Sequence, residues 1–123
     1  MTPEQKIKWI ILDFIGCKEA ITSGNIDEVY DGQDYDVVCE AKYGVRGSGT
    51  ETGLPAPSSR HYEAESVATQ APDGCWVGWT YWYGGGKHGE PEAIDWMEHA
   101  YDVECKEEEK VVVVRTFTKD MTQ

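Results

Sequence analysis

The stretch RHYEAESVATQAPDGCWVGWTYWY, residues 60–83, decides the fold. It holds two runs of strand character, 60–69 and 75–83, and the second is rich in the aromatic and β-branched residues that favour strands. Between them, the residues APDG (71–74) form a turn sequence, because proline presets its φ and glycine accepts a positive φ. We therefore predict an antiparallel hairpin in the middle of the chain.

The sequence on both sides of this hairpin predicts helices and further strands. Thr2 and Gln5 frame a capping box around Pro3, and apolar residues follow at helical spacing, so we predict one amphipathic helix over residues 2–23. Residues 35–43 have strand character, and residues 91–101 carry an apolar face of helical period. Two last strands are expected at 102–106 and 110–119. The second should be central and buried, because residues 111–114 are four valines.

Together these elements predict a single α+β domain over residues 1–123. Its sheet is mostly antiparallel with about five strands, an N-terminal helix covers it, and a second helix precedes the last strands. Residues 44–59 are rich in Gly, Ser, Thr and Pro, so we expect a mobile surface loop there.

The charge is strongly negative, because 23 Asp and Glu stand against 11 Lys and Arg, for a net charge of −12. Such a surface repels phosphates, so we expect no direct contact with nucleic acid. It favours a basic protein partner and an association that salt weakens, although solubility alone would also explain the composition. The sequence does not decide whether the chain also forms a homodimer.

Nothing in the sequence indicates export or a membrane span. No run of about 18 apolar residues is present, and MTPEQKIKW lacks an export pattern. We therefore expect a cytoplasmic protein in a host cell. The four cysteines are widely spaced and form no C-x-x-C pair, so we interpret them as reduced structural thiols.

The strand 75–83 is the main candidate for a binding surface. Its side chains alternate between two faces, and helices can cover only one side of an open sheet. Some of its large aromatic residues should therefore lie near the surface, unless the loop 44–59 folds over them. The candidate contact residues on this strand are Trp76, Trp79, Tyr81, Trp82 and Tyr83.

The glycine-rich sequence GGGK (84–87) follows this strand, where phosphate-binding loops occur. The Walker pattern fails, because Tyr81 and His88 stand where it requires glycine and Ser or Thr. Lys87 and His88 are instead candidates for contact with a partner. Further candidates are two arginines, which could clamp an anion or pair with an acid, and a charged turn that could face a basic partner: Arg60, Arg115, Glu107, Glu108 and Glu109.

No catalytic or metal motif is complete. His61 and Glu63 match the H-x-E half of a zinc deaminase, but the P-C-x-x-C half is missing. No spacing of histidines and cysteines supports a metal site, and no nucleophile elbow surrounds Ser58 or Ser59. We therefore predict no enzyme, no metal and no cofactor.

Residues 78–101, GWTYWYGGGKHGEPEAIDWMEHAY, resemble small uncharacterised proteins encoded by bacteriophages and prophages. The resemblance transfers no site residues. It implies that the chain inhibits a host or defence protein, of the CRISPR or restriction type, by occupying a basic nucleic-acid-binding surface. The alternative is a protein that sequesters a nucleotide signal, with aromatic residues on the base and Lys87, Arg60 or Arg115 on the phosphate. A third interpretation is an enzyme that uses His61 or His88.

Overall fold

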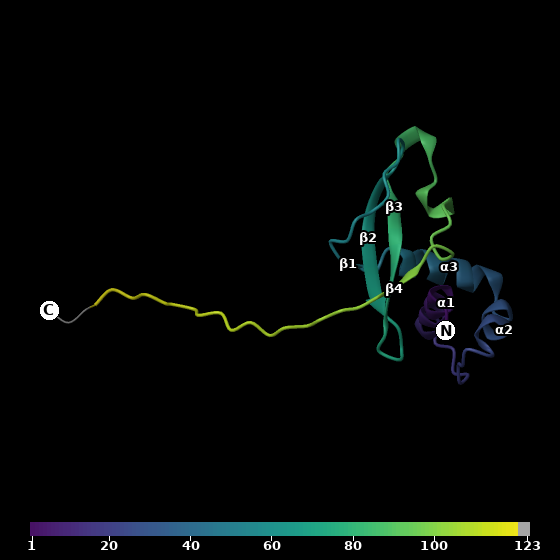
Figure 1. The fold of residues 1–123 in the computed structure, drawn as a ribbon, viewed down its shortest axis with the longest axis horizontal. Coiled ribbons are helices and arrows are strands. Elements are labelled where there is room, and N and C mark those ends of the chain that lie inside the picture. Colours follow the sequence, from purple (N-terminus) through teal and green to yellow (C-terminus); the bar gives the residue numbers. More distant parts are fainter. Residues whose placement is uncertain (121–123) are drawn as a thin grey trace.

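The computed structural model describes residues 1–120 as an α+β fold with one four-stranded antiparallel sheet and three α-helices (Figure 1). The strands are β1 (Thr50–Glu51), β2 (Glu63–Gln70), β3 (Trp76–Tyr83) and β4 (Tyr101–Val103), and they lie in this order across the sheet. The helices α1 (Pro3–Phe14), α2 (Ile26–Asp31) and α3 (Tyr35–Arg46) all lie on one side of it, which we call the helix side. The opposite side is the outer side.

The predicted hairpin is confirmed and forms the centre of the sheet. Strands β2 and β3 pair along their whole length, from Glu63 opposite Tyr83 to Gln70 opposite Trp76. In the turn, the backbone N–H of Gly74 donates to the carbonyl oxygen of Ala71 at 2.9 Å, and Gly74 has φ +92°. This left-handed conformation is the one that the glycine was predicted to supply.

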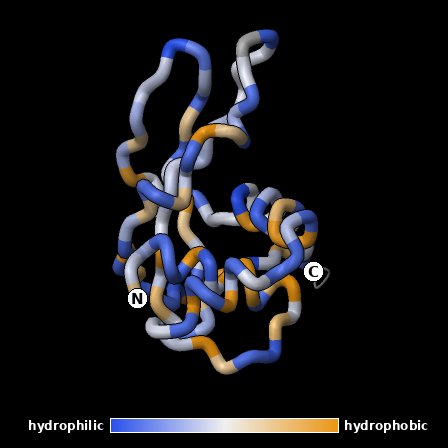
Figure 2. The backbone as a smooth tube through the Cα atoms, turned by 90° about the vertical axis from the view of Figure 1, so that its right-hand side faces the viewer, coloured by the Kyte–Doolittle hydropathy of each residue, from blue (hydrophilic) through white to orange (hydrophobic). Residues whose placement is uncertain are grey.

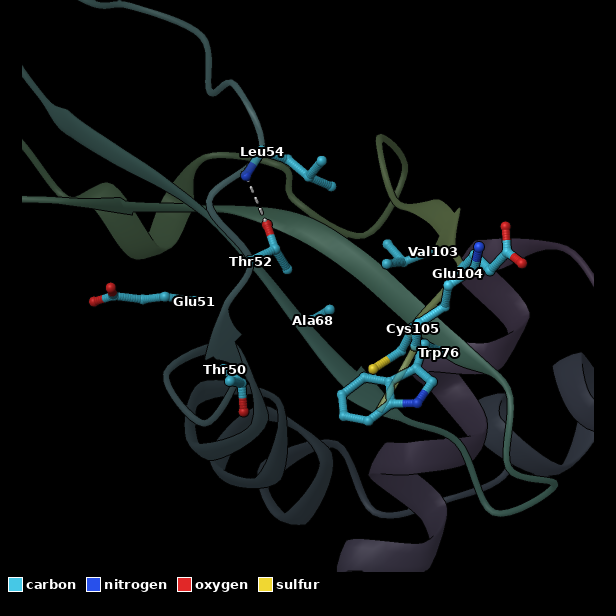
Figure 3. A pocket seen from close by; sticks show the side chains of 10 residues that line it. Thr50, Glu51, Thr52, Leu54, Ala68, Trp76, Val103, Glu104 and Cys105 are labelled. Atoms are coloured by element: carbon cyan, nitrogen blue, oxygen red, sulfur yellow. Dashed lines mark hydrogen bonds between the residues drawn. The ribbon is translucent and has the colours of Figure 1, made fainter. Parts of the chain in front are cut away.

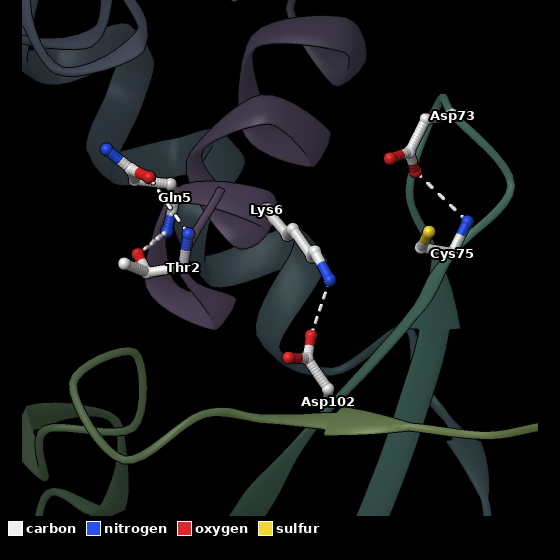
Figure 4. A network of polar contacts seen from close by, with 6 residues as sticks. All are labelled: Thr2, Gln5, Lys6, Asp73, Cys75 and Asp102. Carbon is white, nitrogen blue, oxygen red and sulfur yellow. Dashed lines mark hydrogen bonds and ion pairs between the residues drawn. The ribbon is translucent and has the colours of Figure 1, made fainter. Parts of the chain in front are cut away.

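Helix α1 begins where the sequence predicts but ends nine residues earlier, at Phe14. Its capping box is formed, since Thr2 Oγ1 accepts from the Gln5 backbone N–H at 3.2 Å and Gln5 Oε1 accepts from the Thr2 N–H at 2.9 Å (Figure 4). Gly16 has φ +78°, and the N–H groups of Gly16 and Cys17 donate to the carbonyls of Asp13 and Leu12. This pattern is a Schellman motif, which ends a helix at a left-handed glycine.

The strand predicted for residues 35–43 is wrong, because these residues form most of α3. Asp34 caps this helix, and its carboxylate accepts from the backbone N–H groups of Asp36 and Val37. Ala41 and Val45, four residues apart, are the buried apolar positions, whereas Tyr35 is exposed. The strand-like residues at the start of the segment therefore lie on the solvent side of a helix.

The last third of the chain also differs from the prediction. The helix expected at 91–101 is only a 3₁₀ turn at Pro91–Ala93, followed by irregular chain. The fourth strand is present but short, as β4. The buried fifth strand is wrong: residues 104–120 have no regular secondary structure and extend away from the body of the molecule, and Val111 is 95% exposed (Figure 1).

The core lies between α1, α3 and the helix side of β2 and β3. Trp79 is 0% exposed, its indole Nε1–H donates to the carbonyl oxygen of Arg46 at 3.1 Å, and its ring lies 5.2 Å from that of Trp96. The largest fully buried side chains are Trp79, Ile7, Ile11, Leu12, Ile26, Val45 and Val77.

Two ion pairs join α1 to its neighbours. Lys6 Nζ lies 2.5 Å from Asp102 Oδ1 on β4 (Figure 4), and Lys8 Nζ lies 2.9 Å from Asp27 Oδ1 on α2. The hydrogen bond with Asp102 raises the pKa of Lys6, and the hydrogen bond with Lys8 lowers the pKa of Asp27. Charged groups at the rim of the core thus hold the first helix against both β4 and α2.

The predicted loop 44–59 begins later than expected, after α3 and β1. The remaining loop lies partly against the outer side of the sheet, since Ser66 Oγ on β2 donates to the carbonyl oxygen of Pro55 at 2.9 Å. In Figure 2, two loops rise beyond the end of the sheet where β2 begins and β3 ends, and their outermost residues are hydrophilic.

Candidate functional site

The aromatic residues of β3 divide between the two sides of the sheet, as the strand alternation predicts. Tyr81 and Tyr83 share the helix side with Val77 and Trp79, while Trp76 and Trp82 face the outer side. Trp79 was predicted to contact a partner, but it is fully buried beneath the helices. We therefore assign it to the core, where its size and its hydrogen-bonded indole stabilise the packing of α3 on the sheet.

Tyr81 and Tyr83 lie further along β3 than Trp79, and both are half-buried. Their rings stack, with centroids 5.6 Å apart and an interplanar angle of 21°. The guanidinium carbon of Arg46, at the end of α3, lies 4.7 Å from the centre of the Tyr81 ring. Arg46 Nη2 also donates to the carbonyl oxygen of Trp82, so the arginine is fixed over the tyrosine.

Three glutamates surround this pair of tyrosines. In the register of the hairpin, Glu65 is opposite Tyr81 and Glu63 is opposite Tyr83. Glu51 on β1 lies close enough to Glu65 for a hydrogen bond between the two carboxyl groups. We call this cluster the tyrosine–glutamate surface: Glu51, Glu63, Glu65, Tyr81 and Tyr83.

The electrostatics of the tyrosine–glutamate surface show crowded negative charge. Burial, followed by the hydrogen bond with Glu51 and its negative charge, raises the pKa of Glu65. Burial and the charges of Glu65, Glu63 and Glu51 raise the pKa of Tyr83. Such a surface favours a positively charged group, because a cation relieves the repulsion between carboxylates and is attracted to the face of a tyrosine ring.

The glycine-rich loop after β3 is explained by packing. Gly84, Gly85 and Gly86 have φ values of +76°, +92° and +49°, which favour glycine. A Cβ at Gly89 would lie 2.2 Å from the hydroxyl oxygen of Tyr62, so the backbone passes directly over this ring. The glycines therefore let the loop turn and lie against Tyr62.

Lys87, in the 3₁₀ turn Gly86–His88, is exposed and shares an open hollow of about 620 Å³ with Tyr62 and Glu90. His88 belongs to the same turn, but its side chain lies outside what the structure describes. Arg60 is exposed in the loop before β2. Trp82 faces the outer side, and its ring lies 6.5 Å from that of Tyr62 in an edge arrangement.

The remaining predicted residues lie apart from the aromatic strand. Arg115 and the three glutamates at 107–109 are exposed in the extended segment 104–120, which points away from the sheet (Figure 1). The glutamates are therefore part of an extended segment, and the charged turn predicted for them is absent from the described structure. The structure does not bring Arg115 together with Lys87.

Sequence reasoning missed most of the tyrosine–glutamate surface. Glu63 and Glu65 alternate on a strand, so counting back from the turn at 71–74 places them opposite the tyrosines. That signal was available in the sequence. Arg46 was not detectable, because it was predicted to lie in the loop 44–59 and its contact with Tyr81 depends on where α3 ends.

A second opening, the outer groove, crosses the outer side of the sheet from β1 to the residues after β4 (Figure 3). It has a volume of about 310 Å³, with Leu54 on one rim, Cys105 and Trp76 on the other, and the buried Ala68 between them. On the β4 side of the groove, the Val103 side chain lies over Gly78, where a Cβ would lie 2.7 Å from Val103 Cγ2. Its lining is Thr50, Glu51, Thr52, Leu54, Ala68, Trp76, Val103, Glu104, Cys105 and Lys106.

Comparison with protein-family models, with curated proteins and with solved structures finds no match for this chain. Within residues 1–120, no helix has the length and apolar character needed to cross a membrane. In the same part of the chain, no group of three or more His, Cys, Asp or Glu side chains is arranged to hold a metal ion.

Proposed function

We propose that this protein is a non-enzymatic binding protein whose tyrosine–glutamate surface contacts a basic surface of a protein partner. The observation that carries the proposal is the guanidinium of Arg46 on the ring of Tyr81, beside Tyr83 and the three carboxylates. A cationic side chain of a partner would find the same chemistry at Tyr83, with a ring face and Glu63 and Glu65 as neighbours.

The charge of the whole chain supports the same partner class. With a net charge of −12, the protein attracts basic surfaces over the range of the Debye length and repels nucleic acid. A basic nucleic-acid-binding surface is the partner that such a protein would occupy in place of phosphates. We propose on this ground the role implied by the resemblance, an inhibitor of a host or defence protein of the CRISPR or restriction type.

A binding experiment with an arginine-rich peptide as probe tests the contact surface. We expect binding at about 50 mM NaCl and its loss at about 500 mM NaCl, because screening weakens contacts between exposed charges. The double variant Tyr83→Ala with Glu65→Gln should bind about tenfold more weakly, since it removes a cation–π contact and a charged hydrogen bond.

The matched control is Tyr43→Ala with Glu40→Gln, because this pair makes the same chemical changes on the exposed surface of α3. It should retain nearly all of the affinity. Equal losses in both double variants would show that only net charge matters, and binding that salt does not weaken would contradict the proposal. A pull-down from host lysate, washed at both salt concentrations, then identifies the partner.

The alternative, a protein that sequesters a nucleotide signal, is favoured by one observation. Lys87 and Tyr62 line the same open hollow of about 620 Å³, so a base and a phosphate would have a ring and a cation within one site. A panel of nucleotides should then raise the melting temperature of the protein, and Lys87→Met should abolish the rise. A flat response across the panel would rule this function out.

A further inference from the structure

Two apolar surfaces of this chain lie open within residues 1–120. One is the outer groove between Leu54 and Trp76, and the other is the segment 110–119, which holds four valines and Phe117. Val111 is 95% exposed and Phe117 is 86% exposed. Exposed apolar groups that are contiguous along a chain mark contact sites in proteins that remain soluble.

We propose that residues 110–119 of one copy bind in the outer groove of a second copy, and that the exchange is reciprocal in a twofold dimer. Each copy holds both parts, a groove and an extended segment, so a twofold axis satisfies both contacts at once. The segment is suited to this position because valine and phenylalanine favour extended chain on the surface of a sheet.

The shape of the groove fits such side chains. Leu54 and Cys105 stand on opposite rims, and the small side chain of Ala68 lies between them. Valine side chains from the segment would pack between the exposed Leu54 and the indole of Trp76, above the buried Ala68. This contact would remove from water both the valines and the exposed part of the Trp76 ring.

The charge of residues 110–119 also favours their binding in the outer groove of a second copy. Residues 110–119 contain three cations, Lys110, Arg115 and Lys119, and no acid. Residues 1–109 contain 22 acids and 8 cations. The segment is therefore a basic, apolar strip on an acidic molecule, and it is attracted to the body of another copy. Glu104 lies at one end of the groove (Figure 3), whereas the carboxyl group of Glu51 at the other end belongs to the tyrosine–glutamate surface on the helix side. Lys106 is the only cation among the lining residues of the groove.

The turn chemistry disfavours binding of the segment in its own groove. The chain leaves the groove at Lys106, so it would have to reverse within the next few residues to fold back. Residues 104–110, ECKEEEK, contain none of the Gly, Pro, Asn or Asp residues that tight turns use. Three adjacent glutamates also repel one another and extend the chain, which directs the segment to a neighbour.

Sedimentation equilibrium of the full chain tests the dimer. We expect a mass of twice 13.8 kDa at micromolar concentration. The double variant Val112→Asp with Val113→Asp should weaken dimerisation about 100-fold, because two apolar contacts are lost. Thr116→Asp with Thr118→Asp makes the same change of charge in the same segment without removing a valine. This control should therefore dimerise much more strongly than the double valine variant.

Changes in the groove test the other half of the contact. Leu54→Asp alters a rim residue that is 46% exposed, so it should weaken the dimer while leaving the fold intact. A full chain that remains monomeric at high concentration would overturn the proposal. An equal loss of dimer in the valine and threonine variants would also overturn it, because the contact would then depend on charge alone.

Photo-cross-linking distinguishes a second copy from the same chain. A benzophenone side chain is placed at Phe117, or at Phe14 on α1 as a control that is also exposed, in a mixture of ¹⁵N-labelled and unlabelled protein. The proposal predicts cross-links from position 117 to groove peptides of the other isotope. Cross-links within one isotope only, or the same pattern from position 14, would refute it. These readouts do not involve a basic partner, so they are independent of the proposed function.

Discussion

At the scale of single residues, the balance of contacts at Glu65 describes the candidate site best. Burial and the neighbouring Glu51 raise the pKa of its carboxyl group, whereas a hydrogen bond with Tyr83 lowers it. The net effect is a raised pKa. A residue held in this way is weakly destabilising when charged and well placed to accept a cation. Trp79, two positions before Tyr81 on the same strand, has the opposite role, because its indole is satisfied inside the core.

Glu65→Gln should therefore stabilise the protein at pH 7. A carboxyl group whose pKa is raised on folding destabilises the folded state above its unfolded pKa, and this effect disappears as the pH falls and the group is protonated in both states. We expect a higher urea midpoint for the variant at pH 7 and no difference at about pH 3. Glu40→Gln removes the same charge from the surface of α3 and should have a smaller effect. A gain in the control equal to that of Glu65→Gln would refute this explanation.

At the scale of elements, local signals at the ends of α1 decide its extent. The capping box of Thr2 and Gln5 begins the helix, and Gly16 ends it through a Schellman motif. Packing then decides its position, since Ile7 and Ile11 are buried while Lys6 and Lys8 form ion pairs with β4 and α2.

Removal of the cap should destabilise the fold of residues 1–103, because α1 contributes Ile7 and Ile11 to the hydrophobic core. Thr2→Ala is expected to lower the free energy of unfolding by about 1 kcal/mol, the usual effect of losing a capping side chain. Urea denaturation followed by circular dichroism measures it. Thr116→Ala, in the exposed segment after β4, should leave the stability within error. An unchanged midpoint for Thr2→Ala would show that packing alone fixes the helix start.

At the scale of the whole molecule, charge is distributed unevenly. The body of residues 1–109 carries the excess of acids, whereas residues 110–119 are purely basic among their charged groups. The acidic side chains of this body repel one another, and the free-energy cost of this repulsion falls when salt screens the charges. The same distribution supports both proposals, a basic partner at the tyrosine–glutamate surface and a basic segment in the outer groove.

Salt should therefore stabilise the isolated protein at neutral pH. We expect its melting temperature to rise between about 10 mM and about 300 mM NaCl, because the Debye length shortens over this range. Near the isoelectric point of about 4.5, the same increase in salt should have little effect, since the net repulsion is absent. Differential scanning fluorimetry at both pH values measures this, and an equal shift at both would contradict a charge-based cause.

The sequence by itself determined the features that depend on neighbouring residues. The APDG turn fixed the hairpin and its register, the capping box fixed the start of α1, and the count of acids fixed the charge. With the register known, the position of Glu65 opposite Tyr81 also followed. These signals succeed because a turn, a cap or an alternation is formed by groups a few residues apart.

Only the tertiary structure decided the features that depend on distant contacts. Residues 35–46 have a sequence suited to strand or helix, and burial of Ala41 and Val45 against the core selects the helix. The four valines at 111–114 were predicted to be a central strand, but no strand pairs with them within residues 1–120. Trp79 is buried and Tyr81 meets Arg46 because α3 ends above them, and no local pattern encodes where a helix lies on a sheet.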